Sequence, residues 1–238
     1  MSIKNIIPQI IRLKIRLLKR IIADEIKGYR SKFAKTENTN HPFNHAIKLS
    51  QEIKDSHLCR NKIENIKIAS NKIGKIIINP GEIFSFWRIV EKPDRKNGFK
   101  IGRNIISGKL HEDYGGGLCQ LSGIIYHVSL IAGLNILERY NHTIDLYNDK
   151  TRFTPLGTDA TVVYGYKDLR IMNNYNSPVN FNFEINDHEI VVELRSVEYI
   201  EEKIIRLEKK ELENTIEVFT FNQKDEILNR SHYKKKEC

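Results

Sequence analysis

The sequence predicts an α+β fold, in which an antiparallel sheet packs on a central helix that bears a cysteine and helices precede this core. Isoleucine and leucine recur at helical spacing near the N-terminus. A glycine run at 115–117 is followed directly by a helix-like apolar pattern, and several segments after residue 160 have the composition or alternation of strands. With 238 residues, of which 40% are hydrophobic, the chain can form one sizeable domain with appendages.

The N-terminal segment predicts an amphipathic helix over residues 3–27. Its apolar stripe recurs every three or four residues and comprises Ile7, Ile11, Ile15, Leu18, Ile22 and Ile26. Pro8 falls in the first two turns, where proline is tolerated, and Gly28 is a plausible end. Two interpretations stay open. Either the basic helix contacts an anionic membrane surface, or its stripe docks on the domain and its charges are solvated.

The net charge of +9 is concentrated at the N-terminus. Residues 1–35 hold ten Lys and Arg against two acids, a net of +8, and the remaining chain therefore carries only +1. Because the basic charge lies outside the predicted domain and no aromatic platform accompanies it, we expect no nucleic-acid partner.

We divide the chain into a basic helical segment (1–35), a helical lead-in (36–75), a core domain (76–200) and C-terminal strands or tail (201–238). The lead-in begins with a polar linker and contains an expected helix from about residue 44 to 61. In the tail, weak alternation predicts additional strands or a hairpin, and Lys234-Lys235-Lys236 predicts a frayed end.

Within the core, residues 76–87 are β-rich around a Pro80-Gly81 turn, and residues 104–109 predict a hairpin. A helix with a wide apolar face begins after the glycine run and closes at Gly133. The remaining expected strands are 136–140, 160–166, 169–174, 179–185 and 189–194.

The motif Gly115-Gly116-Gly117-Leu118-Cys119-Gln120-Leu121-Ser122 is the main candidate for chemistry. A cysteine in the first turn of a helix lies beside unpaired N–H groups and the positive end of the helix dipole, which favour the reactive thiolate. The glycines would let a substrate backbone approach closely. The alternative interpretation is a glycine turn followed by a buried small residue.

A cysteine nucleophile also needs a base and a group that orients this base. His142, which follows a predicted strand, is the candidate base. Asp159 and Asp145 are the candidate orienting acids, and a fixed position before a strand favours Asp159. Backbone N–H groups near Cys119 would hold an oxyanion. We expect Gly115, Gly116, Gly117, Gln120 and Ser122 to contact substrate.

The other features of the sequence point away from metals, cofactors and export. The three cysteines, Cys59, Cys119 and Cys238, form no CxxC pair and no disulfide framework, and the histidines fit no metal-ligand spacing. We expect neither a metal nor an organic cofactor. No secretory signal and no run of 18 apolar residues is seen, so a cytoplasmic location is the expectation.

Several motifs together resemble the VanW family, which is named for an accessory protein of bacterial vancomycin-resistance clusters. They are Asn79-Pro80-Gly81-Glu82-Ile83-Phe84-Ser85-Phe86, Asn97-Gly98-Phe99-Lys100, the glycine–cysteine motif, Arg139-Tyr140-Asn141-His142 and Asp159-Ala160-Thr161-Val162. The resemblance covers roughly residues 76–195. It implies peptidoglycan cross-linking of the L,D-transpeptidase type, with Cys119 as nucleophile and His142 as base.

The leading hypothesis is therefore cysteine-dependent acyl transfer on a cell-wall stem peptide or its precursor. One alternative is a non-catalytic module that binds a cell-wall peptide terminus. Another is a peripheral membrane scaffold that binds lipid through residues 1–27.

Overall fold

The computed structural model describes residues 8–37, 41–106, 109–145, 152 and 154–235. Its helices are α1 (Gln9–Ile26), α2 (Cys59–Ile73), α3 (Phe86–Val90) and α4 (Leu118–Ile131), with short 3-10 helices η2 (Arg30–Lys32) and η3 (Arg95–Asn97). Its strands are β1 (His45–Glu52), β2 (Ile77–Ile78), β3 (Ile83–Ser85), β4 (Ile101–Ile106), β5 (Lys109–Tyr114), β6 (Asn135–Glu138), β7 (Arg170–Met172), β8 (Val179–Ile185), β9 (Glu189–Ser196), β10 (Arg206–Glu211), β11 (Thr215–Phe221) and β12 (Ile227–Lys234).

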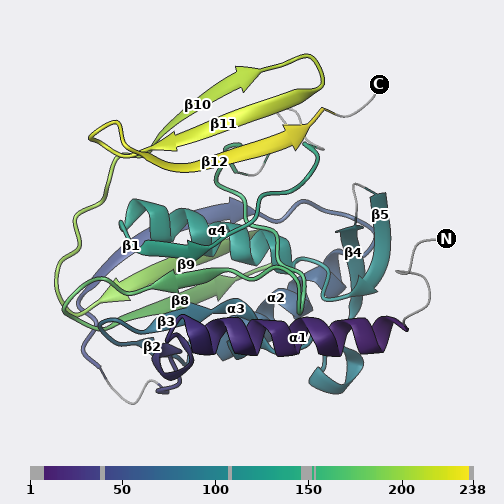
Figure 1. Ribbon diagram of the computed structural model, residues 1–238, viewed down its shortest axis with the longest axis horizontal. Coiled ribbons are helices and arrows are strands. Elements are labelled where there is room, and N and C mark those ends of the chain that lie inside the picture. Colours follow the sequence, from purple (N-terminus) through teal and green to yellow (C-terminus); the bar gives the residue numbers. More distant parts are fainter. Residues whose placement is uncertain (1–7, 38–40, 107–108, 146–151, 153, 236–238) are drawn as a thin grey trace.

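The main sheet has four strands in the order β1-β9-β8-β2, and each neighbouring pair is antiparallel. Helix α4 contacts β1 and β9, while α2 contacts β8 and α4, so the two helices form a layer against the sheet (Figure 1). Ile66 of α2, Leu121 and Ile125 of α4 and Val192 of β9 are fully buried in this core. The predicted α+β architecture, with an antiparallel sheet on the cysteine-bearing helix, is confirmed.

Three smaller antiparallel sheets complete the fold. Strands β3, β7 and β6 form one, the hairpin β4-β5 forms another, and β10, β11 and β12 form a third at the C-terminal end. The third lies beside the main body in Figure 1 and has a small core of Ile216, Val218 and Tyr233. The predicted hairpin and C-terminal strands are thus confirmed, whereas Ser107-Gly108 and Lys236 lie outside the described residues.

Helix α4 forms where its apolar pattern predicts. Gly117 caps it with φ +99°, and Gly133 follows it with φ +67°, both left-handed conformations that glycine adopts without a Cβ clash. Nearly every side chain between these glycines is buried. The helix therefore runs through the centre of the molecule and fixes the position of its first turn.

The expected helix over residues 44–61 is wrong, and the lead-in is helical only from Cys59. Residues 45–52 form β1, an outer strand of the main sheet. The less exposed residues of this strand are Ile47, Leu49 and Gln51, which lie two positions apart. Because the buried residue at position 51 is a glutamine, the apolar residues by themselves do not show this period of two and suggest helical spacing instead. The expected boundaries between the four segments stay predictions.

Two expected strands are also corrected. Within 76–87 the chain forms only the short strands β2 and β3, and α3 begins at Phe86. The Asp168 carboxylate accepts from the Trp87 N–H at 3.1 Å and so binds the first turn of α3, a contact that the local sequence does not reveal. Residues 160–166 form no strand, because the chain turns at Gly165 (φ +79°), whose backbone packs against Leu13.

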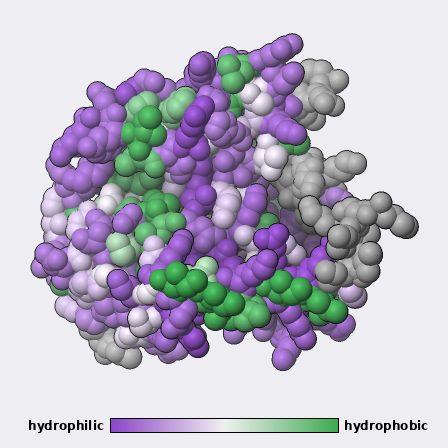
Figure 2. Space-filling view, viewed as in Figure 1, coloured by the Kyte–Doolittle hydropathy of each residue, from purple (hydrophilic) through white to green (hydrophobic). Residues whose placement is uncertain are grey.

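Helix α1 forms as predicted and begins at Gln9, after Pro8, but the face that packs on the protein is not the isoleucine stripe. Ile11, Ile15, Leu18, Ile22 and Ile26 are all between 42% and 81% exposed, and they form the apolar band along the lower edge of Figure 2. Ile7 lies outside the described residues. The interpretation in which this stripe docks on the domain is therefore wrong.

The docked face of α1 carries polar side chains as well as apolar ones. Its less exposed residues are Leu13, Leu17, Arg20 and Asp24, again at helical spacing. Buried Asp24 accepts from Arg170 at 2.5 and 3.1 Å, and Arg20 donates to Glu138 at 2.7 and 2.9 Å. Ion pairs with the core thus orient α1 and leave its isoleucine stripe facing solvent.

Candidate functional site

Cys119 is the second residue of α4, and its side chain is partly buried. Its Sγ lies 3.5 Å from the Thr161 hydroxyl and 3.7 Å from the Val162 carbonyl. The thiol can donate to the carbonyl in its neutral form, and the Thr161 hydroxyl can donate to the thiolate. The extended segment after Asp159 therefore supplies a polar wall on which the sulfur rests in either form.

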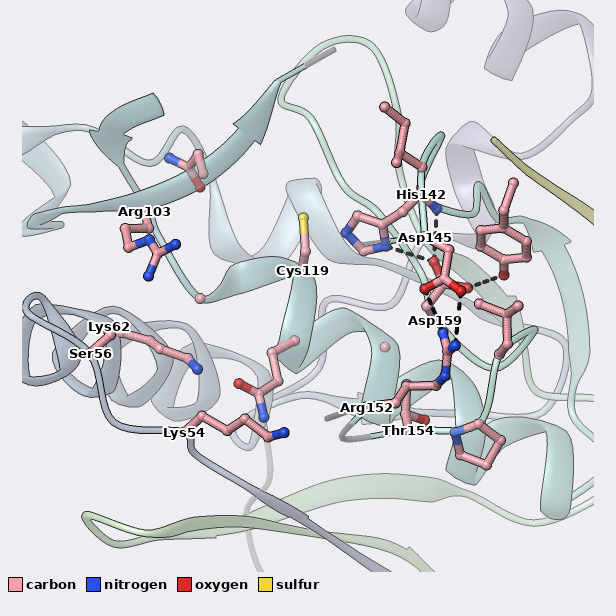
Figure 3. Close-up of a pocket in the computed structure, with 18 of the residues that line it drawn as sticks. Lys54, Ser56, Lys62, Arg103, Cys119, His142, Asp145, Arg152, Thr154 and Asp159 are labelled. Carbon is pink, nitrogen blue, oxygen red and sulfur yellow. Dashed lines mark hydrogen bonds and ion pairs between the residues drawn. The ribbon is translucent and has the colours of Figure 1, made fainter. Parts of the chain in front are cut away.

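His142 follows β6 and lies beside Asp159. Its Nδ1 is 2.6 Å from Asp159 Oδ2, and its backbone N–H donates to the same oxygen at 2.8 Å. With Nδ1 bound to the carboxylate, Nε2 is the ring nitrogen available to Cys119, and Figure 3 shows the ring between the sulfur and Asp159. Of the two acids that the sequence left open, Asp159 contacts His142, whereas Asp145 accepts from Arg152 at 2.7 and 2.8 Å.

Two further groups hold Asp159. Arg139, whose side chain is 2% exposed, donates to Oδ1 at 2.9 Å and to the Asp159 backbone carbonyl at 2.7 Å. The Tyr233 hydroxyl donates to the same Oδ1. Both carboxylate oxygens therefore accept hydrogen bonds, which hold the carboxylate beside His142.

Strand β12 supports this arrangement from the far end of the chain. Besides Tyr233, its Ser231 hydroxyl lies 2.5 Å from Arg139 Nη1. The Asn141 amide donates to the His232 carbonyl at 2.6 Å, which fixes the residue before His142. Sequence reasoning missed Arg139, Tyr233 and Ser231. Arg139 stands in a motif quoted for the family resemblance, but nothing in the sequence of the tail indicates that its strands reach the site.

The electrostatics of the site favour a thiolate–imidazolium pair. Burial acts to raise the pKa of Cys119, but hydrogen bonding and the charge of His142 outweigh it, so that the pKa is lowered overall. Burial alone would lower the pKa of His142, but the Asp159 carboxylate and Cys119 raise it to about 10. Despite burial, His142 and Arg139 hold the pKa of Asp159 well below its usual range. Both shifts favour transfer of the proton from Cys119 to His142.

The three glycines of the run at 115–117 lie in different environments. Gly117 lines the pocket beside Cys119, and a Cβ there would lie 2.7 Å from Cγ of Lys62. A Cβ on Gly116 would lie 2.6 Å from the backbone of Gly102 in β4, and one on Gly115 would lie 2.8 Å from Pro93. Gly115 and Gly116 therefore pack against the protein, and of the three only Gly117 borders the pocket.

The other two expected substrate contacts differ from one another. Gln120 lines the pocket, and its Nε2 donates to the Glu52 carbonyl at 2.8 Å, which ties the end of β1 to the start of α4. Ser122 is fully buried, and its hydroxyl donates to the Ala160 carbonyl at 2.7 Å. Ser122 thus joins α4 to the Asp159 segment and does not reach the pocket.

The pocket around Cys119 has a volume of about 360 Å³, a size that fits a small peptide segment. His142, Asp159 and Tyr233 line it together with Cys119, and basic side chains from α2 and β4 line it as well. Within the part of the chain that the structure describes, the Cys119 N–H makes no hydrogen bond, whereas the N–H groups of Leu118 and Gln120 bond to backbone carbonyls. That free donor points to where an oxyanion could bind.

Two features are absent from the described residues. Among them, no group of three or more His, Cys, Asp or Glu side chains is placed to hold a metal ion. None of the described helices combines the length and the apolar character needed to cross a bilayer.

The fold and the site together define an α+β protein with a cysteine–histidine–aspartate arrangement at the start of a buried helix. The chain belongs to the VanW-like protein family, because the family model described as "VanW like protein" matches residues 61–195. That match includes Cys119, His142 and Asp159 but ends before Tyr233.

Curated relatives agree with this assignment. The chain is 33% identical over 131 residues, 55% of its length, to "Vancomycin B-type resistance protein VanW" of Enterococcus faecalis (strain ATCC 700802 / V583). It is 31% identical over 150 residues, 63% of its length, to "Uncharacterized protein YoaR" of Bacillus subtilis (strain 168). The alignments cover 48% of each relative, so the chain spans about half the length of the curated relatives that it matches. No solved structure matches the chain.

Proposed function

We propose that this protein is an acyl-transfer enzyme with Cys119 as its nucleophile. The observation that supports this best is the meeting of Cys119, His142 and Asp159 in one pocket, with a lowered pKa for the thiol and a raised pKa for the imidazole. A structural cysteine buried in hydrocarbon would have a raised pKa instead. The chain order of nucleophile, base and acid matches the papain-like plan.

In the proposed reaction the Cys119 thiolate attacks the carbonyl carbon of an amide, and a C–S bond forms. The Cys119 N–H binds the resulting oxyanion. As the C–N bond breaks, the imidazolium of His142 gives its proton to the leaving amine, and a thioester remains. An acceptor amine then attacks the thioester while His142 takes its proton, which forms the new amide and restores the thiolate. Asp159, held by Arg139 and Tyr233, keeps the ring in position throughout.

The proposed substrate is a cell-wall stem peptide or its precursor. The relative from Enterococcus faecalis is named for vancomycin resistance, and the family resemblance implies peptidoglycan cross-linking of the L,D-transpeptidase type. With water as acceptor the same site would act as a peptidase. The cytoplasmic location expected from the sequence stays a prediction.

Two measurements test the nucleophile. Iodoacetamide at pH 7 should alkylate Cys119 at least about tenfold faster than Cys59 or Cys238, as followed by peptide mass spectrometry. Intact-mass analysis with a stem peptide should show an acyl adduct that is absent in Cys119→Ser. If Cys119 reacts no faster than Cys238, or if the unmodified protein forms no acyl adduct, the nucleophile is wrong and the alternative is a non-catalytic binding module.

A second proposed property is attachment to an anionic membrane surface through α1. Its isoleucine stripe faces solvent, while Arg12, Lys14 and Lys19 are exposed on the same outward half of the helix. This pattern fits a helix that lies in the interfacial plane of an anionic bilayer. A second copy of the chain fits less well, because a two-fold interface would bring these cations against their own equivalents.

Vesicle flotation tests this attachment. The protein should float with vesicles of phosphatidylcholine and phosphatidylglycerol and should not float with phosphatidylcholine alone. The triple variant Ile15→Ser, Leu18→Ser and Ile22→Ser should bind at least about tenfold less, because three exposed apolar side chains are lost.

The matched control replaces three exposed apolar residues away from α1, with Ile204→Ser, Ile227→Ser and Leu228→Ser. It should float like the unmodified protein. Equal loss in both triple variants, or a change of oligomeric state in the α1 variant alone, would overturn membrane attachment.

A further inference from the structure

The wall of the pocket across Cys119 from His142 is basic. Lys62 of α2 and Arg103 of β4 both line the pocket, and Figure 3 shows them on one side of the sulfur, with His142 and Asp159 on the other. Neither cation has a salt bridge with any residue in the described ranges. The acids of the pocket are otherwise engaged or exposed: Asp145 is paired with Arg152, and Asp55 lies at the surface.

The glycine run places these two cations. The stem of Lys62 crosses directly over Gly117, where a Cβ would lie 2.7 Å from its Cγ. Gly116 packs against Gly102 and against the backbone nitrogen of Arg103, where a Cβ would lie 2.7 Å away. A larger residue at Gly117 would displace the Lys62 stem, and one at Gly116 would displace the backbone of β4 at Arg103. The Gly116-Gly117 pair thus fixes both the nucleophile and the positive charges beside it.

Lys62 is in an unfavourable environment as it stands. Burial is the main cause that lowers its pKa; Cys59 acts in the opposite direction, and the charge of Arg103 lowers the pKa further. A half-buried ammonium beside a second cation is stabilised when an anion binds between them. Glu112 lies opposite Arg103 in the β4-β5 ladder but is exposed and forms no salt bridge with it. A ligand is therefore the natural counter-charge.

We infer that Lys62 and Arg103 form a carboxylate-binding subsite that selects acyl donors carrying a negative charge on the acyl side of the scissile amide. The inference rests on the proposed function, because the position of His142 as proton donor decides which side of the substrate faces Lys62 and Arg103. The leaving amine must lie near the His142 imidazolium that protonates it. The part of the substrate that stays on Cys119 then extends toward Lys62 and Arg103, which can bind a carboxylate.

A pair of thiol reagents tests the subsite separately from the nucleophile. Iodoacetate and iodoacetamide alkylate the same thiolate by the same displacement of iodide, but only iodoacetate carries a carboxylate. The measured quantity is the ratio of their rates at Cys119, with Cys238 as the reference in the same sample. We expect this ratio to be at least about tenfold higher at Cys119 and to fall as salt screens the cations.

The double variant Lys62→Gln and Arg103→Gln should lower the ratio at Cys119 about tenfold while leaving the iodoacetamide rate within about twofold. Lys67→Gln, on α2 but outside the pocket, is the control for lost charge and should leave the ratio unchanged. An unchanged ratio in the double variant overturns the subsite, and so does an equal loss with both reagents, which would mean that the cations act on the thiolate. Slow iodoacetamide labelling of Cys119 in the unmodified protein would instead overturn the nucleophile.

Discussion

The Tyr233 hydroxyl, in the last strand of the chain, donates a hydrogen bond to the Asp159 carboxylate whose other oxygen holds the His142 ring. The same hydroxyl accepts from the Gly157 N–H at 3.1 Å. The C-terminal sheet is thereby joined to the candidate site, although it lies outside the residues that match the VanW-like family model. The orientation of His142 thus depends on residues far from it in sequence.

Tyr233→Phe should therefore weaken the site without removing any member of the Cys119–His142–Asp159 arrangement. Loss of a hydrogen bond to a carboxylate should cost about 2 kcal/mol of unfolding free energy and lower the iodoacetamide rate at Cys119 about three- to tenfold. Urea denaturation and labelling measure the two effects. In the control Tyr175→Phe, the lost hydroxyl binds the Ala132 carbonyl away from the site, so Cys119 labelling should stay unchanged.

The pH profile of Cys119 alkylation should report the ion pair. The lowered pKa of Cys119 keeps the thiolate present below the pH at which an ordinary thiol ionises, and the pKa of His142, about 10, keeps the imidazolium present well above neutrality. The rate at pH 7 should thus be a larger fraction of its plateau value in the native protein than in the unfolded chain. In the urea-unfolded chain it should rise about tenfold per pH unit up to the ordinary thiol pKa near 8.5. A native profile that rises in the same way would exclude the pair.

The choice between the two acids can be tested directly. Asp159→Asn removes the negative charge that raises the pKa of His142, so the thiolate loses its partner and Cys119 labelling at pH 7 should fall at least about tenfold. Asp145→Asn breaks an ion pair with Arg152 and should change the labelling rate by less than about threefold. Similar losses in both variants would show that the two acids act together.

The packing of α1 on the rest of the protein should depend on one buried acid, Asp24. Asp24→Ala leaves Arg170 without its strongest partner, and breaking a buried ion pair should lower the unfolding free energy by about 3 kcal/mol. The neighbouring Glu25→Ala removes an exposed pair with Arg30 and should cost at most about 1 kcal/mol. Urea denaturation gives both values, and limited proteolysis should cut the α1 connection faster in Asp24→Ala only.

The sequence predicts those parts of the site that depend on local chemistry. Helix α4 lies between two glycines with positive φ, and its apolar residues cover a wide face. The position of Cys119 in the first turn therefore follows from neighbouring residues alone. Apolar and polar residues alternate along the sequence of β8, and β8 and β9 both form as expected. Positions next to predicted strands make His142 and Asp159 the candidate base and orienting acid, and the tertiary structure adds the contact between them.

The remaining features required the tertiary structure, because each depends on partners distant in sequence. Residues 45–52 are a strand because β9 offers an edge to pair with, and α3 begins where Asp168 binds its first turn. Helix α1 was recognisable as amphipathic, but ion pairs with Arg170 and Glu138 decided which face is buried. The sequence by itself thus determined the cysteine-bearing helix and the class of the fold. The tertiary structure decided which charges meet around Cys119 and Asp159, because electrostatic and hydrogen-bonding partners are set by distance in space.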